Sequence, residues 1–291
     1  MAEPVLVTGA SSGLGLEIAL HLAERGFRVF ATMRDPTRRA RLDAEAAARG
    51  LELEVLPLDV TDAGSVRAAV ATVVERAGGI YALVNNAGIQ LRGYFEDLAP
   101  REIQDVFDTN LFGAMAVTRA VLPHMRGAGR GRIVMIASMG SRIGCPALSA
   151  YCASKSALEG FGESLALEMK LVGVDVVLLE PSIINTDRFW GENRGVAKGA
   201  LDPGSPYSRW FARLERLAND VVSSAPTRPA DVARVVHRAL TVARPRLRYV
   251  VGRRARLLLR LRAYLPGESF ERIFFAAAMR RITGREPAGG A

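Results

Sequence analysis

Tyr151 and Lys155 are the two side chains of this 291-residue sequence whose types and spacing point most directly to a reaction. They stand four positions apart in a segment with helical periodicity, so both project from one face of the helix. A free phenol has a pKa of about 10 and exchanges protons poorly at neutral pH. A neighbouring ammonium group stabilises the phenolate and brings the phenol into the range of a general acid and base. The pair therefore predicts proton transfer by Tyr151.

Two further polar side chains could serve the same reaction. Ser138 ends a predicted strand at residues 132–138, and its hydroxyl could hydrogen-bond a reacting oxygen. Asn110 lies inside the predicted helix 101–125, where its amide could hold a water molecule that links Lys155 to solvent. Each residue also has a structural alternative, because a serine can cap the end of a strand and an asparagine can be a satisfied polar residue in a helix.

A glycine-rich turn follows the first predicted strand and opens a helix. Its glycines allow the backbone to turn tightly and to approach a ligand closely, and the helix directs free N–H groups toward the turn. This arrangement predicts a site for the pyrophosphate of a dinucleotide, although a tight structural turn without a ligand remains the alternative. The residues of the turn expected to bind the cofactor are Gly9, Ser11, Ser12, Gly13, Leu14 and Gly15.

The end of the second predicted strand bears on the choice between NAD and NADP. An acidic residue at this position holds the ribose diol of NAD, whereas an arginine accepts the 2′-phosphate of NADP. Arg34 and Asp35 stand side by side here, with Arg34 nearer to the strand and Arg38 and Arg39 close behind. The sequence therefore favours NADP(H) over NAD(H), with Arg34 as the residue that binds the phosphate.

These patterns together resemble the short-chain dehydrogenase/reductase family from Val5 to Val251. The matching positions are residues 8–15, Asp59-Val60, residues 85–88, Asn110, Ser138, Tyr151-x-x-x-Lys155 and Thr186. The resemblance implies that Tyr151 is the general acid and base, Ser138 polarises the carbonyl, Lys155 holds the ribose and lowers the phenol pKa, and Asn110 supports a proton relay. Hydride would then pass between the nicotinamide C4 and a carbonyl carbon.

The same resemblance assigns the remaining cofactor contacts. Asp59 and Val60 would meet the adenine, and Asn86, Ala87 and Gly88 would lie along the adenosine and nicotinamide. Further contacts, after the sixth predicted strand, would be Pro181, Ile184 and Thr186. The family usually has Pro-Gly at this point, whereas this sequence has Pro181-Ser182, so the backbone path beside the nicotinamide is in question.

The elements that must position these side chains alternate along the chain. Continuous Val, Ile and Leu runs are typical of parallel strands covered on both faces. They occur at residues 4–8, 28–33, 53–58, 80–85, 132–138, 174–180 and 247–251, and helical patterns at 14–25, 37–49, 63–76, 101–125, 150–172 and 230–243. This order predicts an α/β fold of the Rossmann type, a doubly wound parallel sheet. We expect a catalytic domain at residues 1–252 and a helical extension at 253–291.

An insertion at residues 183–227, read as irregular, is placed to cover the substrate. It carries both tryptophans of the chain, and we expect Phe189 and Trp190, with Ser138 and Tyr151, to contact substrate. An aromatic lid fits a large apolar substrate, unless its aromatic side chains pack only against the body. Residues 29–35 and the long extension resemble the 17-beta-hydroxysteroid and retinol dehydrogenase branch, which mostly uses NADP(H) and acts on lipophilic alcohols and ketones. A steroid, retinoid or polyketide-like substrate is therefore expected.

The charge distribution separates the extension from the body. Basic and acidic residues are equal in number up to residue 243, so the net charge of +9 belongs to the segment from Arg244 onward. This argues against a nucleic-acid-binding body. Residues 253–265 have an apolar stripe of Leu257, Leu258, Leu261, Tyr264 and Leu265, with arginines to the other side. Such a helix predicts peripheral membrane contact, packing over the active-site mouth or a neighbouring subunit, or simple solvated charge.

Other classes of protein are excluded or kept as alternatives. No apolar run is long enough to span a bilayer, no secretory signal fits before the glycine turn, and the two cysteines and three histidines have no metal-binding spacing, so no metal and a cytoplasmic location are expected. The alternatives are a 3-oxoacyl carrier-protein reductase and a non-catalytic dinucleotide-binding sensor or scaffold. Family members usually assemble through helices corresponding to 101–125 and 150–172, so a homodimer or homotetramer is expected.

Overall fold

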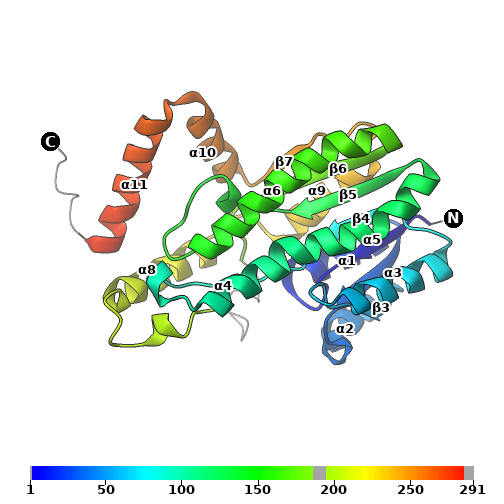
Figure 1. Ribbon diagram of the computed structural model, residues 1–291, viewed down its shortest axis with the longest axis horizontal. Coiled ribbons are helices and arrows are strands. Elements are labelled where there is room, and N and C mark those ends of the chain that lie inside the picture. The colour runs from blue at the N-terminus through cyan, green and yellow to red at the C-terminus, as the bar shows by residue number, and fades with distance from the viewer. Residues whose placement is uncertain (1, 186–194, 285–291) are drawn as a thin grey trace.

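A seven-stranded parallel sheet forms the centre of the computed structural model, which describes residues 2–185 and 195–284 (Figure 1). The strands follow one another across the sheet in the order β3-β2-β1-β4-β5-β6-β7, and every pairing is parallel. Their bounds are β1 Pro4–Val7, β2 Arg28–Met33, β3 Glu54–Pro57, β4 Ala82–Asn85, β5 Gly131–Ile136, β6 Val174–Pro181 and β7 Arg248–Val251. The predicted doubly wound sheet is confirmed.

Helices cover both faces of the sheet because successive strand residues point to opposite sides. In β1, Val5 and Val7 belong to one apolar core and Leu6 to the other. The first core packs against α1 (Gly13–Glu24), α2 (Ala40–Ala48) and α9 (Pro229–Thr241). The second packs against α3 (Ala63–Ala77), α5 (Gly113–Ala128) and α6 (Ser149–Met169). Strands buried on both faces explain the continuous apolar runs of the sequence.

The predicted helix 101–125 contains a π-helical turn beside the site. It consists of α4 (Pro100–Phe107), a π-helical turn η3 (Asp108–Phe112) and α5. A π-turn inserts one extra residue per turn and rotates the side chains that follow, and such turns are frequent at functional sites. Asn110 lies in this turn and is buried. The helical span was therefore predicted from the sequence, but the π-turn at Asn110 within it was not.

The insertion after β6 is more regular than its sequence was taken to be. It contains a short 3₁₀ turn η6 (Gly199–Leu201) and the four-turn helix α8 (Ser208–Ser223). Phe211 of α8 joins Ala197 and Ala200 in a third apolar core with Leu98 and Val106 of the body. The expectation of an irregular insertion is corrected, because the described part of the lid is a helix packed on its own small core.

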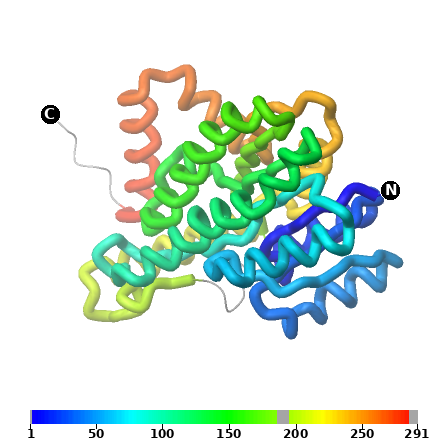
Figure 2. The backbone as a smooth tube through the Cα atoms, turned by 45° about the vertical axis from the view of Figure 1, so that its right-hand side comes forward, coloured from blue at the N-terminus to red at the C-terminus, as the bar shows by residue number. Residues whose placement is uncertain are grey.

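Two helices follow the last strand. They are α10 (Arg253–Tyr264) and α11 (Gly267–Thr283), and together they form a hairpin beside the sheet (Figure 1). The hairpin and the N-terminal strand lie on opposite sides of the molecule (Figure 2). Of the helices in residues 2–185 and 195–284, none has the length and apolar character needed to cross a membrane.

Candidate active site

The predicted catalytic side chains meet in a cavity of about 380 Å³ beyond the carboxyl ends of the strands. Ser138, Tyr151 and Lys155 line it together. The cavity lies next to the point where the strand order reverses between β1 and β4, which is where open α/β sheets bind their ligands. Gly140 lies close to both Ser138 and Tyr151. A Cβ placed on it would be 3.4 Å from Ser138 Oγ and 3.6 Å from Tyr151 Cε1.

Lys155 is held by the end of β5. Its ammonium is buried and donates a hydrogen bond to the Ile136 carbonyl oxygen at 2.8 Å. A Cβ on Gly88 would be 3.5 Å from Lys155 Nζ and 3.0 Å from Asn110 Oδ1. Gly88 therefore brings its backbone close to both side chains, and the positive charge is fixed one helical turn from Tyr151.

Ser138 lies two residues beyond the end of β5 and begins the 3₁₀ turn η4 (Met139–Ser141). Its Oγ accepts a hydrogen bond from the Gly140 N–H at 3.0 Å, so the capping role considered for it is real. Capping uses the hydroxyl as an acceptor only. In the described part of the chain no group accepts a hydrogen bond from this hydroxyl, so its hydrogen can be donated to an oxygen in the cavity.

Asn110 connects the catalytic helix to the loop after β4. Its Oδ1 accepts from the Ile89 N–H at 2.7 Å, and its Nδ2 donates to the Ile89 carbonyl at 2.9 Å and to Ser154 Oγ at 3.0 Å. The fully buried Ser154 donates in turn to the Tyr151 carbonyl at 2.8 Å. Sequence reasoning missed Ser154, although its position three residues after Tyr151 places it on the same helix face.

The glycine turn is joined to the end of β4 by a second set of hydrogen bonds. Thr8 Oγ1 accepts from the Asn86 and Ala87 N–H groups, each at 3.0 Å, and Asn86 Nδ2 donates to the Thr8 carbonyl at 2.9 Å and the Gly9 carbonyl at 3.1 Å. Gly9 has φ +70°, and a Cβ on it would be 2.9 Å from Ala87 Cα. The turn therefore has no room for a side chain at this position.

The residues present fit a dinucleotide pyrophosphate. Ser12 at the N-terminus of α1 makes no capping hydrogen bond through its side chain, and the first turn holds no acidic residue. The first N–H groups of α1 therefore face the turn without a neighbouring carboxylate that would repel a phosphate. The backbone of Gly9 and Gly13 adopts positive φ, which glycine alone adopts without strain.

The two residues that compete for the ribose have different surroundings. Asp35 caps the 3₁₀ turn η1 (Pro36–Arg39), where its Oδ1 accepts from the Thr37 N–H at 3.0 Å and the Thr37 hydroxyl at 2.6 Å. The side-chain hydrogen bond from Thr37 lowers the pKa of the Asp35 carboxyl. Arg39 pairs with Asp43 at 2.7 Å. Arg34 is exposed and forms no ion pair within residues 2–185 and 195–284, so it can meet a phosphate.

The other predicted cofactor residues have the following places. Asp59 closes a turn in which its Oδ1 accepts from the Thr61 N–H at 2.9 Å and the Thr61 hydroxyl at 2.7 Å. Val60 is buried and packs on the backbone of Gly113. Pro181 and Ile184 line the cavity, and so do Leu14, Asn86 and Gly88. Thr186, Phe189 and Trp190 lie outside the described residues.

Ser182, which stands where the family usually has glycine, finds a partner of its own. Its hydroxyl shares a hydrogen bond with Thr227 Oγ1 at 2.9 Å, and its N–H donates to the Val251 carbonyl at 2.9 Å. Among the described residues that are not glycine, only Ala147 has positive φ, so Ser182 needs no conformation reserved for glycine. The Ser182 side chain instead requires a glycine at position 252, because a Cβ on Gly252 would overlap with Ser182 Oγ.

An ion pair between a buried arginine and a partly exposed glutamate in the cavity wall was not predicted from the sequence. Arg92, in the loop after β4, is 3.2 Å from Glu215 of α8 through its Nη1, and both residues line the cavity. Cys145 and Cys152 line it as well. The Cys145 thiol donates to the Ile143 carbonyl oxygen at 3.7 Å, and its interaction with the Cys152 thiol lowers the pKa of Cys152 to about 7 and raises that of Cys145. Arg92 and Glu215 lie far apart in the sequence, so no local pattern predicted that they form part of one cavity wall.

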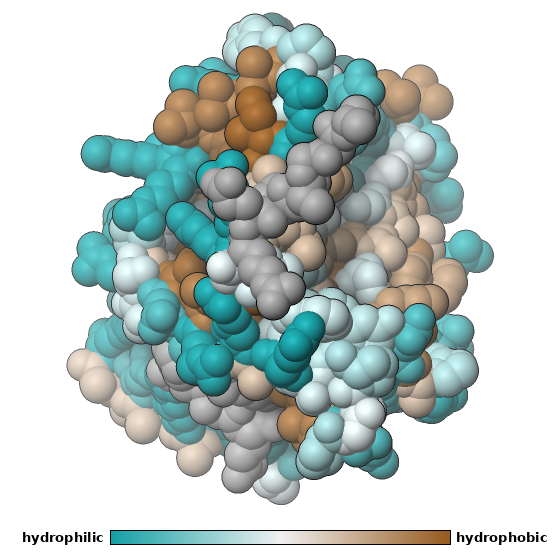
Figure 3. All heavy atoms as spheres, turned by 90° about the vertical axis from the view of Figure 1, so that its left-hand side faces the viewer, coloured by the Kyte–Doolittle hydropathy of each residue, from teal (hydrophilic) through white to brown (hydrophobic). Residues whose placement is uncertain are grey.

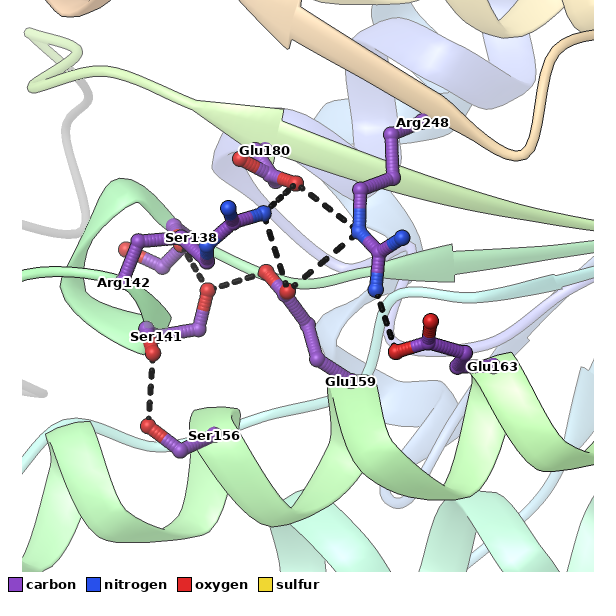
Figure 4. Close-up of polar contacts among 8 residues, drawn as sticks. All are labelled: Ser138, Ser141, Arg142, Ser156, Glu159, Glu163, Glu180 and Arg248. Carbon is purple, nitrogen blue, oxygen red and sulfur yellow. Dashed lines mark hydrogen bonds and ion pairs between the residues drawn. The ribbon is translucent and has the colours of Figure 1, made fainter. Parts of the chain in front are cut away.

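Two buried carboxyl groups lie behind the catalytic serine (Figure 4). Glu159 comes from α6 and Glu180 from β6, and both are almost fully buried. Arg142 Nη1 is 3.4 Å from Glu180 Oε1 and 3.8 Å from Glu159 Oε2. Arg248 Nε is 3.6 Å and 3.7 Å from the same two oxygens. Two guanidinium groups therefore bridge the two carboxyl groups and reduce their mutual repulsion.

This network connects the serine turn to the catalytic helix (Figure 4). The Ser141 hydroxyl contacts both the Glu159 carboxyl group and the Ser138 carbonyl oxygen. Ser156 Oγ donates to the Ser141 carbonyl at 2.7 Å. Because Ser156 and Glu159 lie on the helix that carries Tyr151, these bonds fix the position of Ser138 relative to the phenol.

Replacing Glu180 with glutamine is expected to change how stability depends on pH. Burial, and then the charge of Glu159, raise the pKa of the Glu180 carboxyl above its ordinary value of 4.5. The stability that the protonated group contributes is complete below the unfolded pKa and is lost as the pH rises through the native pKa. The free energy of unfolding of Glu180→Gln relative to the wild type should therefore rise from pH 5 to pH 8, as measured by urea unfolding.

Glu163→Gln is the matched control for this experiment. Glu163 binds the same Arg248 at 2.8 Å, but its side chain is 56% exposed. Solvent screens such a pair, so the difference from the wild type should stay flat over the same range. Equal pH slopes for Glu180→Gln and the wild type would contradict the raised pKa.

Known proteins of one family resemble this chain in sequence and in fold. Residues 3–196 match the profile of the short chain dehydrogenase family. Human 17-beta-hydroxysteroid dehydrogenase type 1 is 37% identical over 98% of this chain and 87% of its own length. Bovine retinol dehydrogenase 8 is 36% identical over 91% of this chain and 86% of its own. A short-chain dehydrogenase from Streptomyces avermitilis superposes with a TM-score of 0.78 and 34% identity, covering 95% of this chain and 98% of that one.

Solved relatives contain either form of the cofactor. A metagenomic short-chain oxidoreductase in complex with NADP is 28% identical, with a TM-score of 0.67 over 86% of this chain and 96% of that one. A short-chain dehydrogenase/reductase from Burkholderia phymatum in complex with NAD is 25% identical, with a TM-score of 0.79 over all of this chain and 98% of that one. The chain belongs to the short-chain dehydrogenase family and is an NAD(P)-dependent oxidoreductase related to the steroid and retinol dehydrogenases.

Proposed function

We propose that this enzyme uses NADP(H) to interconvert a secondary alcohol and a ketone, or an aldehyde, on a lipophilic substrate such as a steroid, a retinoid or a polyketide-like molecule. The observation that carries the proposal is the meeting of Ser138, Tyr151 and Lys155 on one wall of a cavity whose other walls are largely apolar. The apolar lining comes from Ile89, Leu148, Ile183, Ile184, Leu214, Ala218, Val221 and Val222.

In the proposed reaction the protein binds the substrate oxygen and transfers a proton to or from it. The bound dinucleotide supplies or accepts the hydride. The Ser138 hydroxyl donates a hydrogen bond to the substrate oxygen, which orients it and withdraws charge from its carbon. Tyr151 gives its proton to that oxygen in reduction and removes it in oxidation. Lys155 places a buried positive charge one helical turn away, and Asn110 holds the loop at Ile89 against the same helix.

The preference for NADP(H) is supported by the different engagement of Arg34 and Asp35. The Asp35 carboxyl is occupied as a cap by Thr37, whereas the Arg34 guanidinium is exposed at the end of β2. A guanidinium binds a phosphate through parallel charge-assisted hydrogen bonds. The 2′-phosphate of NADP would therefore meet a residue that is available, and the ribose diol of NAD a residue that is already engaged.

Replacing Arg34 with alanine tests this preference. The KM for NADPH should rise by about 10- to 100-fold, because a hydrogen bond between charged groups is lost, while the KM for NADH changes little. Arg39→Ala is the control, since this guanidinium is engaged with Asp43 and should affect both cofactors weakly. Steady-state kinetics with both cofactors decide the question, and equal effects of Arg34→Ala on the two would contradict the assignment.

The substrate class is supported by the cavity and by the relatives. Human 17-beta-hydroxysteroid dehydrogenase type 1 and retinol dehydrogenase 8 are named for lipophilic substrates, and a Bacteroides relative is named 3-ketodihydrosphingosine reductase. NADPH oxidation measured against steroid, retinoid, quinone and acyl-thioester carbonyls tests the proposal. A preference for the acyl thioester would identify a carrier-protein reductase instead, and cofactor binding without any turnover would identify a sensor or scaffold.

We further infer that the enzyme assembles as a homodimer or homotetramer through α5 and α6. Three large apolar side chains at these helices and the turn after α6, Phe112, Leu167 and Leu171, are at least half exposed in the single chain. Large apolar side chains left exposed on the surface of a single chain often mark subunit interfaces. A monomer in light scattering at micromolar concentration would contradict the inference.

A further inference from the structure

The hairpin of α10 and α11 exposes apolar side chains on the side turned away from the protein. On α10, Tyr264 is 86% exposed, Leu257 61% and Leu261 45%. These three residues lie at positions i, i+4 and i+7, so they form one stripe along the helix. Exposure of such an apolar stripe to water costs free energy, and contiguous exposed apolar patches mark sites that bind a partner or a membrane.

The hairpin is attached to the body through a different set of side chains. Ala255 of α10 is buried, although it stands only two positions before Leu257 and therefore points nearly the opposite way around the helix. Phe270 and Ile282 of α11 are buried as well. The Arg262 guanidinium lies 5.7 Å above the Phe270 ring and joins the two helices. Because Ala255 is buried whereas Leu257 and Leu261 are exposed, the exposed stripe is not the face by which α10 attaches to the body.

Arginines flank the exposed stripe. Five arginines of α10 are exposed and lie among and beside the apolar residues, namely Arg253, Arg254, Arg256, Arg260 and Arg262. Three more on α11, Arg272, Arg280 and Arg281, are exposed, against two acidic residues, Glu268 and Glu271, in the described hairpin. Figure 3 views the side of the molecule that carries α11, and hydrophilic and apolar side chains stand next to each other on its upper part.

We propose that the hairpin of α10 and α11 is a docking surface for an anionic lipid bilayer. Leucine and tyrosine side chains enter the boundary between head groups and acyl chains, while long arginine side chains reach the phosphates beside them. A second copy of the hairpin fits this surface poorly, because it would bring the two groups of arginines against each other. A surface that is both apolar and strongly positive instead matches the apolar interior and negative surface charge of the bilayer.

The hairpin also lies next to the lid. Gly284, which ends α11, packs against the Arg213 guanidinium of α8. The same helix α8 supplies Leu214, Ala218 and Val221 to the cavity, and Val221 is partly exposed. A docked hairpin would therefore hold the lid near the bilayer in which a lipophilic substrate dissolves. This consequence rests on the proposed function, whereas membrane docking itself does not.

Co-sedimentation of the full-length protein with lipid vesicles tests the proposal. Binding is expected to vesicles of phosphatidylcholine with about one third phosphatidylglycerol, and to weaken as salt screens the charges. Vesicles of phosphatidylcholine alone should bind much less protein. The triple variant Leu257→Gln, Leu261→Gln, Tyr264→Ser should bind anionic vesicles at least about tenfold more weakly, because its apolar contact is lost.

A second variant tests the role of the charge. Arg253→Gln, Arg256→Gln, Arg260→Gln should remove the preference for anionic over neutral vesicles. The control is Arg67→Gln, Arg126→Gln, two exposed arginines on α3 and α5 that should leave binding unchanged. Thermal unfolding and light scattering confirm that each variant is folded and report its mass.

Three results would overturn the proposal. They are a wild-type protein that binds neither kind of vesicle, binding that is equal for neutral and anionic lipid, and an apolar variant that loses mass in light scattering but keeps its vesicle binding. The last result would make the stripe a contact between subunits. Vesicle binding is measured without turnover, so failure here is distinct from failure of the proposed oxidoreductase activity.

Discussion

Replacing Tyr151 with phenylalanine is expected to lower kcat by about 10²- to 10⁴-fold, the usual contribution of a general acid and base. The substitution removes one oxygen atom from a ring that lines the cavity beside Ser138 and Lys155. Because Ser138 and Lys155 stay in place, the variant should still bind cofactor and substrate with similar affinity. The loss should therefore fall on kcat rather than on KM, as steady-state and single-turnover kinetics will measure.

Tyr81→Phe is the matched control for the loss of a phenol hydroxyl. Tyr81 directly precedes β4, and its Oη donates to the Leu240 carbonyl of α9 at 2.7 Å. Neither residue lines the cavity. Removal of the Tyr81 hydroxyl should reduce the free energy of unfolding by about 1 kcal/mol and leave kcat unchanged. A Tyr151→Phe protein with near-normal turnover would contradict the mechanism, whatever its stability.

The sheet could be predicted because its signal is local. Strands buried on both faces read as continuous apolar runs, and each of the seven runs overlaps one observed strand. The glycine turn is equally local, since Gly9 and Gly13 each require a backbone conformation that disfavours other residues. For the same reason Tyr151 and Lys155 could be placed on one helix face before any contact was known.

The π-turn and the lid helix show two different limits of such patterns. The extra residue at Asn110 leaves the apolar periodicity of 101–125 nearly intact, so one long helix was the simplest interpretation. The helix α8 did carry a signal, with Phe211, Leu214, Ala218 and Val222 at helical spacing, but the aromatic residues and glycines of the insertion obscured it.

The buried acid network could not be predicted from sequence. Glu159, Glu180 and Arg248 lie on three elements far apart along the chain, and each alone reads as an ordinary exposed charge. The ion pair of Arg92 with Glu215 could not be predicted either, because it joins the loop after β4 to the lid helix α8. Ion pairs of this kind depend on how the elements pack, and they supply what the catalytic motif lacks, namely a rigid connection between the serine turn and the tyrosine helix.

Replacing Gly15 with alanine is expected to damage the cofactor site more than its single added methyl group would suggest. A Cβ at this position would overlap with the Gly9 carbonyl oxygen and with Asn86 Nδ2. The carbonyl cannot move without displacing the glycine turn, and Asn86 cannot move without losing its bonds to Thr8 and Gly9. A displacement of about 1 Å in such a turn can cost about 100-fold, which is the fall in kcat/KM expected for the cofactor.

Gly160→Ala separates this effect from the general consequence of adding a methyl group to a helix. Gly160 lies in α6, where a Cβ would meet nothing within 4 Å, so alanine there should raise the free energy of unfolding by about 0.5–1 kcal/mol. Gly15→Ala should lower it by about 1–3 kcal/mol, as overpacked sites do, and isothermal titration should show weakened dinucleotide binding. If Gly15→Ala binds the dinucleotide as tightly as Gly160→Ala, the cofactor does not depend on the close approach of α1 to the ends of β1 and β4.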